Sequence, residues 1–375
     1  MKYFLIAGEP SGDMHGANLM RGILAEDPEA EFRFWGGDKM AEVGGEQGLL
    51  KHYRESSFFG FLQVVLNLRT ILAQMDACRR EITSFAPDVL ILIDYAGFNL
   101  KMAKHAHSIG IKTHFYIAPK VWAWNEKRVK IIRKYVDELF IIFPFEKEYF
   151  RRHQIEAHFE GNPLLDALEL EREALPSREA FCSKNNLSAD RQTIALLSGS
   201  RRGEIFDNLP IMVAASRSFP EYEFVVAGVD WIDRALYEKI LEGSSVRLIF
   251  SQTYSLVQHS HAAIVTSGTA TLETALLGTP EVVLYKLNPI IKLLKPLLLK
   301  IPYISLVNLV LGREAVCEIT QASANPKRLI AELGKILSGS ERERMLNDYK
   351  ELQEKMGKAG ASHRFAAKMT KLIKQ

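Results

Sequence analysis

A run of small and polar residues from Ser267 to Glu273 has the composition of a ligand-binding turn. It follows an apolar stretch, residues 262–266, that predicts a buried strand, and it leads into a predicted helix. Such a turn lets the backbone approach a ligand closely and aims the first free N–H groups of the helix at it. A phosphate or diphosphate is the natural occupant, and Glu273 is placed to bind the hydroxyls of an attached ribose. An ordinary strand-turn-helix connection, with Ser267 or Thr269 as N-cap, is the alternative interpretation.

A second candidate anion site follows another predicted strand. Arg201 and Arg202 come directly after a Gly-Ser turn. A guanidinium group in this position can form paired hydrogen bonds with phosphate oxygens. We favour a phosphate-binding role for Arg201, because loops of this kind face the ligand in open α/β sheets. The alternative is a surface arginine that pairs with Glu204.

A candidate general base ends the strand predicted at residues 88–94. Asp94 is expected to be partly buried there, which would raise the pKa of its carboxyl toward values useful for proton transfer. The alternative role is an N-cap for the next helix. Glu9 and Asp13 are predicted to lie on the first loop and to face the same site. His15 is a rival base, although a lone histidine near a loop is more often structural.

Alternating strands and helices must position these residues. The chain opens with a strand at residues 2–7, a Gly/Ser loop and a helix from about residue 14, which is typical of a doubly wound α/β domain. An apolar strand at residues 193–197 begins a second domain of the same kind. Because ligands bind beyond the carboxyl ends of parallel strands, we expect the two domains to face each other across a cleft.

The domain junction is predicted in the polar segment at residues 169–191. We therefore expect an N-terminal domain at residues 1–168 and a C-terminal domain at residues 169–341. Helices at residues 342–375 are expected to pack back on the first domain or on a partner chain, which would make a homodimer.

The composition and the missing motifs argue against several classes of function. The 375 residues are 47% hydrophobic and 25% charged, and the net charge of +3 does not argue for nucleic acid. The three scattered cysteines fit a reducing cytoplasm. No signal peptide and no membrane span are recognised. The sequence lacks P-loop, G-x-G-x-x-G, D-x-D, H-E-x-x-H and paired-cysteine motifs, so we expect neither a metal nor a cofactor.

Two strongly apolar segments suggest a partner of low polarity. One is a helix predicted at residues 58–75, and the other is residues 290–302, where lysines interrupt an apolar run. Such segments can lie on an anionic bilayer surface or meet a lipid substrate. Burial in the core or at a subunit interface is the alternative for each.

Several motifs occur together in one order along the chain. They are Gly8-Glu9-Pro10-Ser11-Gly12-Asp13, Asp94 with Phe98-Asn99, Val121-Trp122-Ala123-Trp124, Phe143-Pro144-Phe145-Glu146, Gly199-Ser200-Arg201 with Glu204-Ile205, Ser267-Gly268-Thr269-Ala270-Thr271-Leu272-Glu273, and Tyr303-Ile304-Ser305-Leu306 with Asn308. With these motifs, the chain resembles the lipid-A-disaccharide synthase family from end to end.

The resemblance implies an α/β fold of the GT-B class, with two Rossmann-like, doubly wound parallel-sheet domains. It implies an inverting transfer from UDP-2,3-diacylglucosamine to 2,3-diacylglucosamine 1-phosphate, giving a β-1,6 disaccharide 1-phosphate and UDP. It also implies a metal-independent enzyme of lipid A biosynthesis, at the cytoplasmic face of the inner membrane of a Gram-negative bacterium.

The resemblance also implies roles for individual residues. The catalytic set is Asp94, Glu9 and Arg201. The expected contacts to the UDP donor are made by Ser200, Arg201, Ser267, Gly268, Thr269, Ala270, Glu273 and Asn308. The expected contacts to the acceptor are made by Ser11, Gly12, Asp13 and Asn99.

Three other functions remain as alternatives. A UDP-N-acetylglucosamine 2-epimerase would share the two domains and the Ser-Gly turn, but a soluble substrate explains neither apolar segment. A glycosyltransferase with another lipid acceptor is the second alternative. An exported sugar-binding protein is the third, and it would need neither Asp94 nor Arg201.

Overall fold

The computed structural model describes residues 1–55, 67–123, 125–286, 302–320 and 323–374. Of the segments expected to meet lipid, residues 58–66 and 290–301 lie outside the described residues, as does Trp124. The chain divides into two compact units. The first unit consists of Met1–Asp166 with Gly357–Gln375, and the second of Ala167–Met356.

The first unit is built on a seven-stranded sheet in the order β3-β2-β1-β4-β5-β6-β7, with every neighbouring pair parallel. Its central strand β4 has the sequence VLILI and is buried on both faces, as expected of a parallel sheet covered on both sides. The strands are β1 Lys2–Ala7, β2 Glu31–Gly36, β3 Leu49–His52, β4 Val89–Ile93, β5 Lys112–Tyr116, β6 Glu138–Ile141 and β7 Ala157–Phe159.

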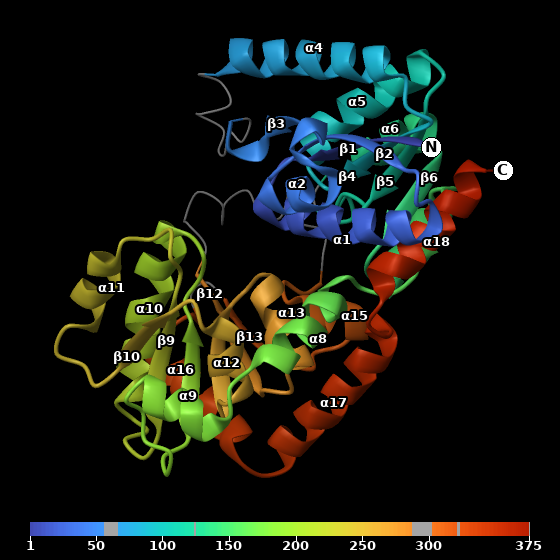
Figure 1. The fold of residues 1–375 in the computed structure, drawn as a ribbon. Coiled ribbons are helices and arrows are strands. Elements are labelled where there is room, and N and C mark those ends of the chain that lie inside the picture. The colour runs from blue at the N-terminus through green and yellow to red at the C-terminus, as the bar shows by residue number, and fades with distance from the viewer. Residues whose placement is uncertain (56–66, 124, 287–301, 321–322, 375) are drawn as a thin grey trace. The chain divides into compact units, whose positions relative to one another are not determined.

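Helices cover both faces of this sheet (Figure 1). One apolar core lies under α4, α5 and α6, and the other lies under α1, α2 and α18. The helices are α1 Pro10–Glu26, α2 Asp38–Gly44, α4 Leu68–Phe85, α5 Ala96–Ser108, α6 Val129–Tyr135, α7 Pro144–Arg152 and α18 Ala361–Ile373, with short 3-10 turns at Glu46–Gly48, Tyr53–Glu55 and Glu126–Arg128.

The first helix begins earlier than predicted. We expected a loop up to about residue 13, but α1 starts at Pro10, directly after the extended residue Glu9. Proline suits the first position of a helix, because its fixed φ is helical and its missing N–H would have no partner there. Ser11, Gly12 and Asp13 therefore lie in the first turn of α1 rather than on a loop.

The second unit is built on a six-stranded parallel sheet in the order β10-β9-β8-β11-β12-β13. The strands are β8 Thr193–Leu197, β9 Glu223–Gly228, β10 Arg247–Phe250, β11 Ala262–Thr266, β12 Glu281–Tyr285 and β13 Cys317–Thr320. The helices are α8 Leu164–Ala174, α9 Arg178–Lys184, α10 Arg202–Ser216, α11 Arg234–Leu241, α12 Thr253–Gln258, α13 Thr269–Leu276, α15 Leu306–Leu311, α16 Pro326–Leu337 and α17 Ser340–Met356.

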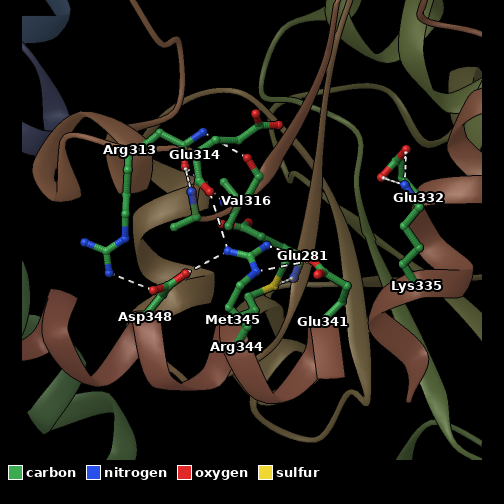
Figure 2. Close-up of polar contacts among 12 residues, drawn as sticks. Glu281, Arg313, Glu314, Val316, Glu332, Lys335, Glu341, Arg344, Met345 and Asp348 are labelled. Carbon is green, nitrogen blue, oxygen red and sulfur yellow. Dashed lines mark hydrogen bonds and ion pairs between the residues drawn. The ribbon is translucent and has the colours of Figure 1, made fainter. Parts of the chain in front are cut away.

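The C-terminal helices do not form one block, because α17 belongs to the second unit and α18 to the first. Figure 2 shows an ion pair that ties α17 to its own unit: Arg313, which lies before β13, binds Asp348 of α17 at 2.7 Å. In the described part of the chain, no helix has the length and apolar character needed to span a bilayer.

Candidate active site

The turn between β4 and α5 holds Asp94 in an unusual backbone conformation. Asp94 and Tyr95 both have a φ of +45°, in the left-handed region that residues other than glycine seldom adopt. Two hydrogen bonds hold this turn: the Asp94 N–H donates to the Tyr116 carbonyl at 3.1 Å, and the Asn99 side-chain amide donates to the Asp94 carbonyl at 2.8 Å. Strain of this kind costs of order 1–3 kcal/mol per residue and is concentrated at functional sites.

The neighbouring strand β1 ends against the same turn. A Cβ atom at Gly8 would lie only 2.4 Å from Cδ1 of the Tyr95 ring. The Gly8 position therefore needs glycine, because the ring packs directly on the backbone. This close packing brings Glu9, the next residue, to the edge of the sheet where Asp94 lies.

Asp94 lines a hollow of about 330 Å³ that belongs wholly to the first unit. We call it the Asp94 hollow, and its walls are Glu9, Asp94, Tyr95, Ala96, Gly97, Pro119, Lys120, Val121 and Arg128. Asp94 is exposed to solvent rather than partly buried as expected, although neighbouring protein atoms crowd its carboxyl. This desolvation raises the pKa of its carboxyl, against the opposing effects of the Lys120 ammonium and the Tyr95 backbone N–H.

Two residues expected to contact an acceptor are instead part of the framework. Asp13 is buried, and its carboxylate accepts hydrogen bonds from the backbone N–H groups of Gly37, Lys39 and Met40 at 2.7–3.1 Å. It therefore caps the first turn of α2. Asn99 is fully buried and donates to backbone carbonyls at the ends of β1 and β4. We correct both expectations: these side chains position the turns, and neither lines the Asp94 hollow.

The remaining residues predicted for this region differ in their burial and in whether they line the Asp94 hollow. Glu9 is in the wall of the Asp94 hollow, as the sequence suggested. Ser11 is exposed, whereas Gly12 is buried against Ala7. His15 does not line the Asp94 hollow, and burial lowers the pKa of its imidazole to about 4, so it is neutral at physiological pH.

A second hollow, of about 380 Å³, lies in the second unit beyond the ends of β8 and β11. We call it the Ser267 hollow, and its walls are Leu197, Gly199, Ser200, Arg201, Glu204, Ala227, Val229, Thr253, Thr266, Ser267, Gly268, Thr269, Ala270 and Glu273. It brings together every residue predicted to bind a UDP donor except Asn308. The helix α13 begins in it at Thr269, so the first N–H groups of that helix are available to a ligand. The buried Thr266 hydroxyl has no hydrogen-bond partner among the described residues.

Arg201 lies where either of the two roles left open by the sequence could be performed. It lines the Ser267 hollow, and its Nη1 also donates to Oε1 of Glu204 at 3.0 Å. The Arg201 side chain is 81% exposed, so this ion pair contributes at most about 1 kcal/mol and an incoming phosphate can replace it. Gly199, with a φ of +117°, allows Glu204 to fold over the turn, since a Cβ there would be 2.6 Å from that of Glu204.

Glu273 is oriented by a residue that sequence reasoning missed. The hydroxyl of Tyr254, in α12, donates to Oε1 of Glu273 at 2.9 Å. Burial raises the pKa of the Glu273 carboxyl, and the hydrogen bond from Tyr254 opposes that rise. Nothing in the local sequence marks Tyr254, because the contact depends on how α12 packs beside α13.

Asn308 does not reach the Ser267 hollow, which corrects its expected role. It is fully buried, and its amide donates to the Val316 carbonyl and to Glu318, both at 2.9 Å. Its oxygen accepts from two backbone N–H groups, so the amide has no capacity left for a ligand. A chain of hydrogen bonds links it to the hollow: Glu318 also accepts from the Ile304 N–H, and the Ile304 carbonyl accepts from the Ser267 hydroxyl at 3.1 Å.

Sequence comparison decides between the families that share this architecture. A family model described as lipid-A-disaccharide synthetase matches residues 3–371. The chain belongs to the lipid-A-disaccharide synthase family. It is 36% identical to the lipid-A-disaccharide synthase of Syntrophus aciditrophicus over 99% of this chain and 97% of that protein. It is 35% identical to that of Myxococcus xanthus, with the same coverage.

Members of the lipid-A-disaccharide synthase family are glycosyltransferases of lipid A biosynthesis, and their fold is of the GT-B class. Two solved structures show the same architecture at much lower identity. The UDP-GlcNAc 2-epimerase of Neisseria meningitidis, bound to UDP-GlcNAc, matches with a TM-score of 0.69 and 13% identity over 99% of this chain and all of that one. The calicheamicin glycosyltransferase CalG4 matches with a TM-score of 0.59 and 13% identity over 99% of this chain and 98% of that one.

Proposed function

We propose that this protein transfers 2,3-diacylglucosamine from UDP to the 6-hydroxyl of 2,3-diacylglucosamine 1-phosphate, with inversion at the anomeric carbon. The observation that carries the proposal is the pairing of two sites in one chain of this family. One is a hollow at a helix start with a nearby arginine and glutamate, and the other is a carboxylate on a strained turn. Donor binding and proton transfer are the two tasks such a reaction needs.

Asp94 is the proposed general base. Its raised pKa favours proton uptake, and its open side gives a hydroxyl access. As Asp94 takes the proton of the acceptor hydroxyl, the bond from that oxygen to the anomeric carbon forms. The bond from the anomeric carbon to the diphosphate breaks at the same time, and UDP leaves with its electron pair. Glu9, in the same wall, is a second carboxylate that can orient the acceptor.

The leaving diphosphate gains negative charge, which the Ser267 hollow is suited to stabilise. The N-terminus of α13 and the Arg201 guanidinium supply fixed positive charge and hydrogen-bond donors. We assign the ribose hydroxyls to Glu273, held by Tyr254. No group of three or more His, Cys, Asp or Glu side chains suited to a metal occurs in the described ranges. We assign the stabilisation of the leaving diphosphate to the N-terminus of α13 and to Arg201.

The test is UDP release by the purified protein, in mild detergent with EDTA, supplied with the diacylated donor and the diacylated sugar phosphate. We expect release that requires both substrates and yields a β-1,6-linked disaccharide by NMR. Conversion of UDP-N-acetylglucosamine without an acceptor would contradict the proposal and favour an epimerase. Release only with a different lipid acceptor would keep the reaction type and change the substrate.

Association with the membrane surface and a homodimer also stay predictions. The apolar substrates and the cationic segment near residue 295 support association with an anionic surface of the inner membrane. Flotation with anionic vesicles, compared with neutral ones, tests this association.

A further inference from the structure

A third hollow opens beside Asp94 on the same unit, and no step proposed so far uses it. It has a volume of about 620 Å³, within the range of small-molecule sites. We call it the α4–α6 groove. Its walls come from α4, α5, α6 and the 3-10 turn before α6, and they are Leu72, Met75, Arg79, Ala96, Gly97, Leu100, Lys101, Lys104, Arg128, Ile131 and Tyr135.

The floor of the α4–α6 groove is apolar, and part of that apolar surface is exposed. Leu72 and Ile131 are 48% and 38% exposed. Met75 and Leu100 are buried beneath them. The helices α4 and α5 are neighbours on the same face of the sheet, and both contribute to the core beneath them. Exposed aliphatic groups gathered round a concavity mark a place for an apolar ligand.

The rim of the groove is cationic. Arg79, Lys101, Lys104 and Arg128 line it, and the lining includes no aspartate or glutamate. Of the four rim cations, Arg79 forms an ion pair with Asp76 of its own helix, at 3.0 Å. The helix α5 contains no acidic residue at all. The groove therefore suits an amphiphile with an apolar chain and an anionic head group.

The groove is continuous with the Asp94 hollow, because Ala96, Gly97 and Arg128 line both. The space beside Gly97 is open, since no atom lies within 4 Å of the place where its Cβ would be. A ligand can therefore occupy both spaces, with its sugar beside Asp94 and its chain in the groove. A flat bilayer surface would explain the cations but not the concavity or this connection.

We propose that the α4–α6 groove binds an acyl chain of the phosphorylated acceptor, and that Lys101 and Lys104 face the phosphate of that acceptor. This inference rests on the proposed function and adds the residues that select the acceptor. It makes the groove a determinant of acceptor affinity, with no effect on the donor.

The test compares two double variants with matched controls, all assayed in neutral detergent micelles. Leu72→Gln with Ile131→Gln removes the exposed apolar floor, and its control is Leu170→Gln, at a residue that is 66% exposed in α8. Lys101→Gln with Lys104→Gln removes rim charge, and its control is Lys147→Gln, at an exposed lysine of α7.

We expect the apolar double variant to raise the KM for the diacylated acceptor about tenfold and to leave the donor KM unchanged. The lysine variant should lose the preference for the phosphorylated acceptor over the same lipid without phosphate. A wild-type acceptor KM in both double variants would overturn the inference. Weaker binding to anionic vesicles, with an unchanged acceptor KM in detergent, would also overturn it and assign the surface to the bilayer. If the wild-type protein shows no turnover with any acylated acceptor, the proposed function fails and this inference falls with it.

Discussion

Single side chains in the recognised motifs have two kinds of role. Asp94, Arg201 and Glu273 line hollows and can touch a substrate. Asn99 and Asn308 are fully buried, and their side-chain amides donate hydrogen bonds to backbone carbonyls of the adjoining turns. Both kinds are polar residues within the recognised motifs, so the sequence pattern does not separate them. Burial separates them, because a side chain with no exposed surface cannot meet a ligand directly.

Lys120 is the residue that most clearly tunes the proposed base. Its ammonium opposes the raised pKa of Asp94, so Lys120→Gln should raise that pKa further. Since the carboxylate is the active form, the acidic limb of the profile of kcat/KM against pH should move to higher pH. The shift should shrink as salt is added, because Lys120 is exposed. The control Lys147→Gln should leave the acidic limb in place. If Lys120→Gln also leaves it in place, either Asp94 is not the group that titrates in this limb or Lys120 does not influence its pKa.

At the level of elements, the loop after β5 forms part of the wall of the Asp94 hollow, and a hydrogen bond to a side chain of α7 holds the loop in place. Pro119, Lys120 and Val121 lie in the wall of the hollow. The next residue, Trp122, donates its indole N–H to Oε1 of Glu146 at 2.9 Å. Glu146 is 1% exposed, and its other oxygen accepts two backbone N–H groups at the start of α7. The motif that contains Trp122 and the motif that contains Glu146 therefore form one structural unit, which supports the wall of the Asp94 hollow.

This unit can be tested by paired substitutions. Glu146→Gln keeps the cap on α7 but turns an NH₂ group toward the indole N–H of Trp122, and this should cost about 1–3 kcal/mol of unfolding free energy. Trp122→Phe removes the indole donor. The double variant should then lose less than the sum of the single losses, by about 0.5–3 kcal/mol in urea unfolding. Strictly additive losses would mean that the two side chains act independently.

The strands could be predicted well, and the helix starts less well. Runs such as residues 89–93 are apolar on both faces, which is a strong local signal for a buried parallel strand. The start of α1 was placed too late, because the Gly/Ser composition after Gly8 resembles a loop. Pro10 at the first helical position was the signal that could have corrected it.

At the scale of the whole molecule, the path of the C-terminal segment could not be read from local patterns. Asp166 accepts hydrogen bonds from the N–H groups of Gly360, Ala361 and Ser362 at 2.7–3.0 Å, and it caps the start of α18. That contact joins residues almost two hundred positions apart, so only the folded chain brings them together. The overall architecture is shared with epimerases, and so it was the motifs and not the fold that pointed to the family.

The most direct test of the account separates donor binding from proton transfer. UDP affinity, by calorimetry, and turnover are measured on the same preparations of Asp94→Asn and Glu273→Gln. We predict that Asp94→Asn lowers kcat about 10²–10⁴-fold with an unchanged Kd for UDP. Glu273→Gln should weaken UDP binding about tenfold or more, because it removes a charged hydrogen-bond acceptor. Wild-type turnover in Asp94→Asn, or wild-type UDP affinity in Glu273→Gln, would contradict the assignment of a base to the first unit and a donor site to the second.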